Sequence, residues 1–149
     1  MEVLPVLSLE RRKALVVGGA GGGIGSAITH SLAQAGAHVS VITNDTSHAD
    51  SIHSEAKERG HDIHCHIKDV TDLKAFTTTV DDVIAANGSI HHLVNVVGGA
   101  EVRDWSRAKD YELEMFDRIM TRNLRYALIS CQRIASSLIS GSTAGSIVN

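Results

Sequence analysis

A glycine-rich turn is the first stretch of this sequence that could do chemistry. Residues Gly18–Gly25 read Gly-Gly-Ala-Gly-Gly-Gly-Ile-Gly and directly follow the apolar run Ala14–Val17. Because glycine has no side chain, such a turn lets the backbone approach a phosphate group closely. A helix that begins at Ile24 would direct its free N–H groups and its positive dipole end at the same anion. The sequence therefore predicts a phosphate-binding loop, with a tight strand-to-helix turn that binds nothing as the alternative.

Two polar residues stand near the ends of later apolar segments. Asp69 follows the segment Ile63–Ile67, and Asn95 lies within the segment Ile90–Val97. If these segments are parallel strands, both residues reach the edge of the sheet where open α/β folds bind ligands. There the Asp69 carboxylate could accept a hydrogen bond from the amino group of a base, or it could serve only as a turn or capping acid. We expect the Asn95 amide to connect neighbouring strands by bonding to backbone groups, with an ordinary strand-ending turn as the alternative.

The histidines raise the question of a metal site. His64 and His66 alternate along one predicted strand with His61 nearby, and His91 and His92 precede another strand. Zinc needs about three or four converging nitrogen, sulfur or carboxylate ligands. Two histidines on one strand face are too few, so the sequence predicts no metal site.

The composition describes an ordinary globular chain of 149 residues. Its net charge of −3 gives no reason to expect a nucleic acid or an anionic membrane as a partner. No apolar run reaches the roughly 18 residues that a membrane-spanning helix needs, and Met1–Leu7 is too short for a signal peptide. Cys65 and Cys131 show no CxxC spacing, so we expect free thiols in a reducing cytoplasm.

Strand-like and helix-like segments alternate along the whole chain and would position these residues. The strand-like segments are Ala14–Val17, Ala37–Thr43, Ile63–Ile67, Ile90–Val97 and Ser146–Asn149. Helical spacing is expected over residues 24–36, 46–60, 72–87, with Thr71 as the N-cap of the third helix, and 114–140. The alternation predicts an α/β fold, a Rossmann-type doubly wound parallel sheet. The sheet would be incomplete, with about five strands and the last one cut short.

Four motifs in this order resemble the N-terminal part of the classical short-chain dehydrogenase/reductase (SDR) family. They are Gly19–Gly25 for the family's Gly-xxx-Gly-Ile-Gly turn, Asp69-Val70, Asn95-Val96-Val97-Gly98 and Asn123-Leu124. Gly18 stands where the family usually has threonine, and two residues of the third motif differ from Asn-Asn-Ala-Gly. The resemblance covers nearly the whole chain.

The resemblance implies a nicotinamide dinucleotide cofactor and hydride transfer to or from a small-molecule carbonyl or secondary alcohol. The cofactor-binding positions that it carries over are Gly19, Gly22, Gly23, Ile24, Gly25, Thr43, Asn44, Asp69, Val70, Asn95, Val97 and Gly98. Asn123 is the one catalytic position carried over, where the family's asparagine sits at a helical kink and anchors a proton-relay water. A full-length protein of this family would be a homo-oligomer, a dimer or a tetramer.

The cofactor itself stays open between NAD and NADP. In the family register Thr43 and Asn44 stand at the end of the second strand, where an acid would bind a ribose 2′-hydroxyl. Asp45 follows and could still reach the ribose, while neither the glycine turn nor Asn44 offers a cation for a 2′-phosphate. The missing acid gives a slight lean to NADP.

The serine, tyrosine and lysine that the resemblance also implies are not among these residues. Tyr111 and Tyr126 are followed four residues later by Met115 and Ser130, so neither begins a Tyr-xxx-Lys pair. We therefore expect residues 1–149 to be a single dinucleotide-binding domain, truncated at its C-terminus and catalytically incompetent alone. The alternatives are a naturally short, non-catalytic dinucleotide-binding module and an inactive fragment. The nucleotide sequence after the codon for Asn149 would distinguish them.

Overall fold

The computed structural model describes residues 8–149. The expectation of no signal peptide over Met1–Leu7 lies outside the described residues. The strands are β1 (Lys13–Val17), β2 (His38–Thr43), β3 (Ile63–Ile67), β4 (His92–Asn95) and β5 (Ser146–Val148). The α-helices are α1 (Ile24–Gln34), α2 (Thr46–Arg59), α3 (Leu73–Asn87), α4 (Leu113–Met120) and α5 (Tyr126–Ser140). Three short helical segments complete the described chain, namely η2 (Val102–Asp104), η3 (Ala108–Asp110) and η4 (Thr121–Arg125).

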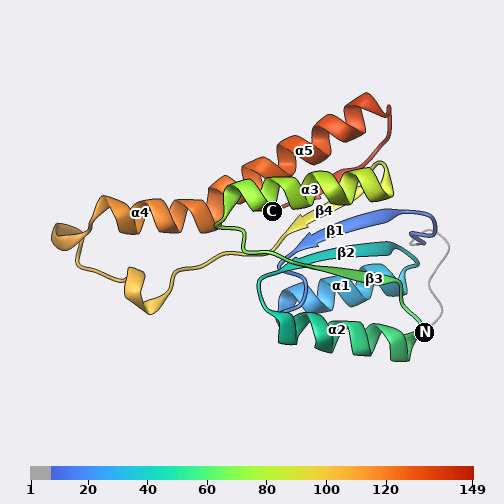
Figure 1. The fold of residues 1–149 in the computed structure, drawn as a ribbon, viewed down its shortest axis with the longest axis horizontal. Coiled ribbons are helices and arrows are strands. Elements are labelled where there is room, and N and C mark those ends of the chain that lie inside the picture. The colour runs from blue at the N-terminus through green and yellow to red at the C-terminus, as the bar shows by residue number, and fades with distance from the viewer. Residues whose placement is uncertain (1–7) are drawn as a thin grey trace.

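All strand pairs are parallel, and the strands lie in the order β3-β2-β1-β4-β5. The order runs outward from β1 in both directions, so the crossover helices that lead towards β3 and those that lead towards β5 fall on opposite faces of the sheet. Helices α1 and α2 cover one face, and α3 and α5 cover the other (Figure 1). This confirms the predicted Rossmann-type doubly wound α/β fold, in which the fifth strand has three residues.

The central strand β1 is buried on both faces. Leu15 and Val17 belong to the cluster that packs under α3 and α5, whereas Ala14 and Val16 belong to the cluster under α1 and α2. All of these side chains are fully buried. Burial from both sides explains why the sequence of this strand is a continuous apolar run rather than an alternating one.

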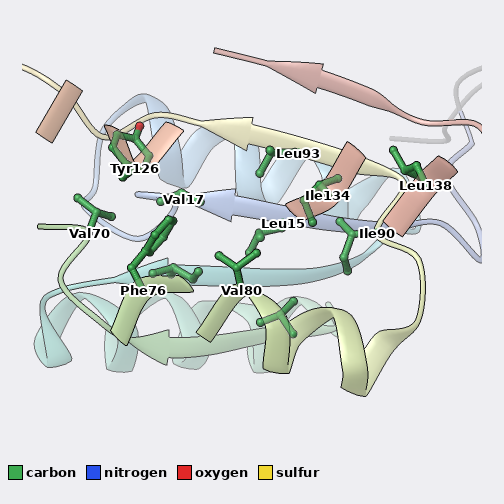
Figure 2. Packing of buried hydrophobic residues seen from close by; sticks show 12 residues of the cluster. Leu15, Val17, Val70, Phe76, Val80, Ile90, Leu93, Tyr126, Ile134 and Leu138 are labelled. Carbon is green, nitrogen blue, oxygen red and sulfur yellow. The ribbon is translucent and has the colours of Figure 1, made fainter. Parts of the chain in front are cut away.

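An aromatic pair joins the two helices that cover the first of these clusters. Phe76 of α3 and Tyr126 of α5 meet edge to face, with ring centroids 5.8 Å apart. Figure 2 shows both rings among the aliphatic side chains of β1 and β4. Because Tyr126 is the first residue of α5, this packing also fixes the position of η4, the segment immediately before it.

The third helix begins one residue later than the sequence suggested. We predicted Thr71 as the N-cap, but Asp72 caps α3 by accepting a hydrogen bond from the Ala75 N–H at 3.0 Å. Thr71 is engaged elsewhere, because its N–H and its hydroxyl both donate to Oδ1 of Asp69 at 2.8 Å. An Asx turn at Asp69 therefore displaces the helix start.

Two other predicted elements differ from the observed ones. The predicted strand Ile90–Val97 is regular only over β4, although the Val96 N–H still donates to the Val17 carbonyl at 2.9 Å. The predicted helix over residues 114–140 is interrupted by η4, which is π-helical. Single π-helical turns inside α-helices are frequent at functional sites.

The segment between β4 and η4 extends beyond the edge of the sheet, where α4 forms a projecting arm (Figure 1). Its exposed large hydrophobic side chains are Val102, Trp105, Tyr111, Leu113 and Phe116. Asp104 fixes the base of the arm by accepting hydrogen bonds from Nε and Nη2 of Arg118 at 3.2 and 3.1 Å. Among the described residues, the helices are all too short or too polar to cross a bilayer.

Candidate functional site

The strand order reverses between β1 and β4, whose carboxyl ends lie side by side. Open α/β sheets bind ligands at such a point because the flanking crossovers leave on opposite faces. A cleft of roughly 330 Å³ opens here. Its walls include Gly18 after β1, Thr43 at the end of β2, Lys68 after β3 and Val97 after β4. This cleft is the candidate site.

The glycine turn lies tightly against the start of α1. A Cβ atom on Gly25 would lie 2.0 Å from the carbonyl oxygen of Gly18, so no other residue fits without moving the backbone. Gly18 has a φ of 89°, and a Cβ there would lie 2.7 Å from Cγ2 of Val97. Glycine at these positions lets the turn, the helix and the end of β4 meet in one place.

Thr29 stabilises this turn, and the sequence analysis did not single it out. The Thr29 side chain is fully buried in α1, and its hydroxyl donates to the Gly19 carbonyl at 2.9 Å. A Cβ on Gly19 would lie 2.5 Å from that hydroxyl oxygen. The signal in the sequence is a polar residue on the buried face of α1, which Thr29 shares with Gly25 and Ala33. Gly19 and Gly25 thus shape the turn, while other residues line the cleft.

The remaining predicted residues of the turn leave an open cradle at the N-terminus of α1. Gly22, Gly23 and Ile24 are exposed, and a Cβ on Gly22 or Gly23 would meet no atom within 4 Å among the described residues. The Gly22 N–H donates to the Ser26 hydroxyl at 2.8 Å. No described side chain caps the helix at Gly23, so its first N–H groups face solvent. This cradle fits a pyrophosphate group, which needs close backbone approach and N–H donors.

The end of β2 presents polar but uncharged groups to the cleft. Thr43 and Asn44 line it together with His48 from the first turn of α2. Asp45, the acid that could have reached a ribose, caps α2 instead. Its Oδ1 accepts hydrogen bonds from the Ser47 hydroxyl at 2.6 Å and from the His48 N–H at 3.1 Å. These bonds, the one from Ser47 first, lower the pKa of the Asp45 carboxyl and hold it as a capping carboxylate.

Asp69 and Val70 line the cleft after β3, as the sequence predicted for this edge. Both described contacts of the Asp69 carboxylate use Oδ1, which receives the backbone and side-chain hydrogens of Thr71. Within the described residues the second oxygen, Oδ2, is left available to a ligand. The two interpretations of Asp69 as a turn acid and as a ligand acceptor are therefore compatible.

Asn95 forms part of the floor behind the cleft and is 8% exposed. Its Nδ2 donates to Oδ1 of Asn149 at 2.7 Å, and its Oδ1 accepts from the Ser130 hydroxyl at 2.9 Å. We expected this amide to bond to backbone groups, but its partners are side chains from α5 and from the residue after β5. Asn95 therefore connects the central sheet to two later elements, and it does not line the cleft.

The residues after β4 line the cleft directly. Val97 and Gly98 form its wall, and the Tyr126 hydroxyl donates to the Val97 carbonyl at 2.7 Å. Burial of that phenol raises the pKa of Tyr126 to about 12. Tyr126 is consequently a neutral hydrogen-bond donor that positions Val97, in agreement with its exclusion from any Tyr-xxx-Lys pair.

Asn123 lies in the middle of the π-helical segment η4. Its Oδ1 accepts a hydrogen bond from the Gly99 N–H at 2.7 Å. Its Nδ2 donates to the carbonyls of Gly99 and Ile119 at 2.9 and 2.8 Å. The side chain thus holds the loop after Gly98 against the helical bulge and stands beside the cleft, outside its lining.

Three charged residues of the cleft were not predicted. Lys68, Glu101 and Arg122 line it, and the Arg122 guanidinium pairs with the Glu101 carboxylate. Arg122 arrives from η4, and Glu101 from the loop after β4, so only the folded chain brings them together. The sequence offered one hint, which is the position of Arg122 immediately before Asn123.

Half of the predicted cofactor positions therefore line the cleft and the other half support or border it. Those in the lining are Thr43, Asn44, Asp69, Val70, Val97 and Gly98. Those outside it are Gly19, Gly22, Gly23, Ile24, Gly25 and Asn95.

Comparison with known proteins identifies similar chains. The model of the family described as short chain dehydrogenase matches residues 13–149. The chain is 32% identical over 143 residues to the short chain dehydrogenase/reductase dpchG of Colletotrichum higginsianum, covering 95% of this chain and 52% of that protein. It is 27% identical over 137 residues to the 7alpha-hydroxysteroid dehydrogenase of Bacteroides fragilis, covering 92% and 52%. The chain spans about half the length of these curated relatives.

Solved structures of dehydrogenases are also similar to this chain. A short-chain type dehydrogenase/reductase from Mycobacterium marinum superimposes with a TM-score of 0.85 at 26% identity, covering 99% of this chain and 58% of that one. The citronellol catabolism dehydrogenase of Pseudomonas aeruginosa superimposes with a TM-score of 0.82 at 29% identity, with coverage of 99% and 58%.

Proposed function

Because the chain belongs to the short-chain dehydrogenase family, we propose that it binds a nicotinamide dinucleotide at the carboxyl edge of its sheet. The observation that carries this proposal is the open cradle at Gly22 and Gly23, set between a tightly packed turn and the cleft. Among residues 8–149 no atom lies within 4 Å of a Cβ built on Gly22 or Gly23, so the cradle is open to a pyrophosphate group.

Each part of the dinucleotide has a proposed place. The N–H groups around Gly22, Gly23 and Ile24 bind the pyrophosphate. Asp69 and Val70 receive the adenine, since the free carboxylate oxygen can accept from an amino group. The adenosine ribose lies by Thr43 and Asn44.

The nicotinamide end lies by Val97 and Gly98, on the wall that Asn95 and Asn123 support. In the proposed catalytic role, Asn123 anchors a proton-relay water at the helical bulge. Asn95 and Asn123 would then position the nicotinamide end of the cofactor indirectly, by holding the cleft wall at Val97 and Gly98 in place.

For the choice between cofactors we retain the lean to NADP. The carboxylate of Asp45 is committed to the N-terminus of α2, and Asn44 lines the cleft without a charge. A ribose 2′-phosphate would therefore meet no competing acid at the end of β2, and His48 stands close by as a donor. NADPH is expected to bind more tightly than NADH.

For the whole protein we propose oxidoreductase activity on a small-molecule carbonyl or secondary alcohol. The bound nicotinamide supplies or accepts the hydride, and this chain's residues bind it, orient it and form one side of its cleft. Residues 1–149 are proposed to be one dinucleotide-binding domain, and the Tyr-xxx-Lys pair is not among them. Dinucleotide binding is consequently the activity proposed for these residues by themselves.

Helix α4 of the projecting arm and the two helical segments that follow it, η4 and α5, favour self-association, and we propose a homo-oligomer. Phe116 of α4, Leu124 of η4 and Leu128 of α5 are all about half exposed or more. Apolar side chains gathered along one helical run are typical of a protein interface. Light scattering should give a mass above that of one chain, and Phe116→Ser should lower that mass.

We also propose a cytoplasmic location, because Cys65 and Cys131 are both free thiols.

Isothermal titration calorimetry of the purified chain with NADPH and with NADH tests the proposal that the chain binds a nicotinamide dinucleotide. Gly22→Asp places a negative charge in the cradle and should weaken binding by at least about tenfold. Gly60→Asp is the matched control, because Gly60 also has a positive φ and open space around it but lies at the far end of α2. The absence of binding to either nucleotide, or equal binding by the two variants, would contradict the proposal.

A further inference from the structure

Three metal-ligand side chains meet at the edge of the sheet opposite the cleft. Nδ1 of His38 lies 2.6 Å from Oδ2 of Asp62, and Nε2 of His64 lies 3.0 Å from Oδ1 of the same carboxylate. One ligand atom from each residue falls within 4.8 Å of the others. The imidazole rings of His38 and His64 have centroids 5.0 Å apart.

The strand register brings these residues together. Val39 pairs with Ile63 and Ser40 pairs with His64, which places His38 beside Asp62 at the amino ends of β2 and β3. The Val39 N–H donates to the Asp62 carbonyl at 3.0 Å, and the His38 N–H donates to the Arg12 carbonyl at 3.0 Å. Since side chains alternate along a strand, His64 lies on the same face as Asp62 while Ile63 enters the core.

The donor set has the chemistry of a divalent transition-metal site. Imidazole nitrogen and carboxylate oxygen are ordinary ligands of zinc, at about 2.0–2.2 Å. An ion placed among these atoms needs only small side-chain rotations, because the ligand atoms already converge. The side chains of Asp62 and His64 are 62% exposed and that of His38 is 27% exposed, so an ion can enter from solvent.

A hydrogen-bonded triad without an ion is the simpler account of these contacts, but such a triad would contribute little to the stability of the fold. Exposed pairs between histidine and carboxylate stabilise a protein little, and here one carboxylate is shared by both rings. The other neighbouring histidines do not converge in this way. His91 and His92 have ring centroids 6.4 Å apart, and no carboxylate is bonded between them within the described residues.

We propose that His38, Asp62 and His64 bind one divalent transition-metal cation of the zinc class. The ion joins β3, which is the edge strand, to β2 at the end of the sheet away from the cleft. Three protein ligands leave a position for water in a tetrahedral site. The site is independent of dinucleotide binding, because none of its residues lines the cleft.

Calorimetric titration of the metal-stripped chain with Zn²⁺ tests the proposal, and Co²⁺ serves as the spectroscopic probe. We expect one ion to bind and to raise the melting temperature, and Co²⁺ to give the strong visible absorption of tetrahedral coordination. Asp62→Asn keeps the shape of the side chain but removes its charge, and His64→Gln removes a ligand. Each should weaken binding by at least about tenfold.

The matched control is His53→Gln, which removes an exposed histidine of α2 and should leave the affinity unchanged. Circular dichroism should be the same for all variants, because Asp62 and His64 are exposed. Retention of the parent's affinity by both Asp62→Asn and His64→Gln would overturn the proposal. Loss of the tight site in His53→Gln would overturn it as well.

Discussion

The side-chain amide of Asn123 bonds to both backbone polar groups of Gly99, accepting from its N–H at 2.7 Å and donating to its carbonyl at 2.9 Å. A side chain in a π-helical bulge thereby fixes the loop that follows β4. Since Gly98 of that loop lines the cleft, the geometry of the bulge determines the geometry of the site.

Replacing Asn123 with alanine should therefore weaken dinucleotide binding. The variant loses both bonds to Gly99, and each ordinary hydrogen bond contributes about 1 kcal/mol. Loss of both bonds removes about 2 kcal/mol, so we expect an affinity about thirtyfold lower, measured by calorimetry, since 1.4 kcal/mol corresponds to about a factor of ten. Gln132→Ala, at an exposed position of α5, is the control and should bind as the parent does. Unchanged affinity in Asn123→Ala would mean that the loop is ordered without this side chain.

Gly25→Ala should destabilise the fold itself. The new methyl group would lie 2.0 Å from the Gly18 carbonyl oxygen, so the turn must move away from α1. We expect a loss of about 1–3 kcal/mol in the free energy of unfolding, measured by urea denaturation. Gly21→Ala is the comparison, because the nearest atom to its Cβ is 4.0 Å away. Equal stabilities of these two variants would show that the close approach is not required.

Thr29→Val tests the contribution of the Thr29 hydroxyl, because valine has nearly the same volume as threonine but no hydroxyl. The substitution leaves the Gly19 carbonyl without its buried donor, at a cost of about 1–3 kcal/mol. Thr29→Ser retains the hydroxyl and loses a methyl group, so it should keep more of the dinucleotide affinity even if its melting temperature also falls. The opposite ranking in affinity would assign the role of Thr29 to packing alone.

Tyr126→Phe should make the stability of the protein less dependent on alkaline pH. The pKa of this phenol is raised from 10.0 to about 12 in the folded state by burial. The favourable contribution of the neutral form is therefore complete below pH 10 and is lost as the pH rises towards 12. Urea denaturation of both proteins at several pH values across this range should show the parent losing more stability than the variant.

At neutral pH the same variant should be less stable than the parent by about 1–3 kcal/mol, because the Val97 carbonyl loses its donor. An identical pH dependence of parent and variant would contradict the assignment of a buried, neutral phenol at this position.

The sequence alone determined the fold class and the location of the candidate site. The continuous apolar run Ala14–Val17 followed by glycines, and the alternation of strand and helix, are local patterns set by side-chain volume and backbone freedom. Parallel strands bring their carboxyl ends to one edge, so Asp69, Val97 and Gly98 could be assigned to that edge before any contact was known.

Only the tertiary structure decided which distant residues meet. Contacts such as Asn95 with Asn149, or Glu101 with Arg122, depend on the register of strands and the phase of a helix, which local patterns do not encode. Local patterns also do not show which of several neighbouring groups forms a given hydrogen bond. Asp69 binds Thr71, for example, so Asp72 and not Thr71 caps α3. The same reason explains the cluster opposite the cleft. The sequence shows His64 and His66 alternating on one strand, but the pairing of β2 with β3 is what places His38 beside Asp62.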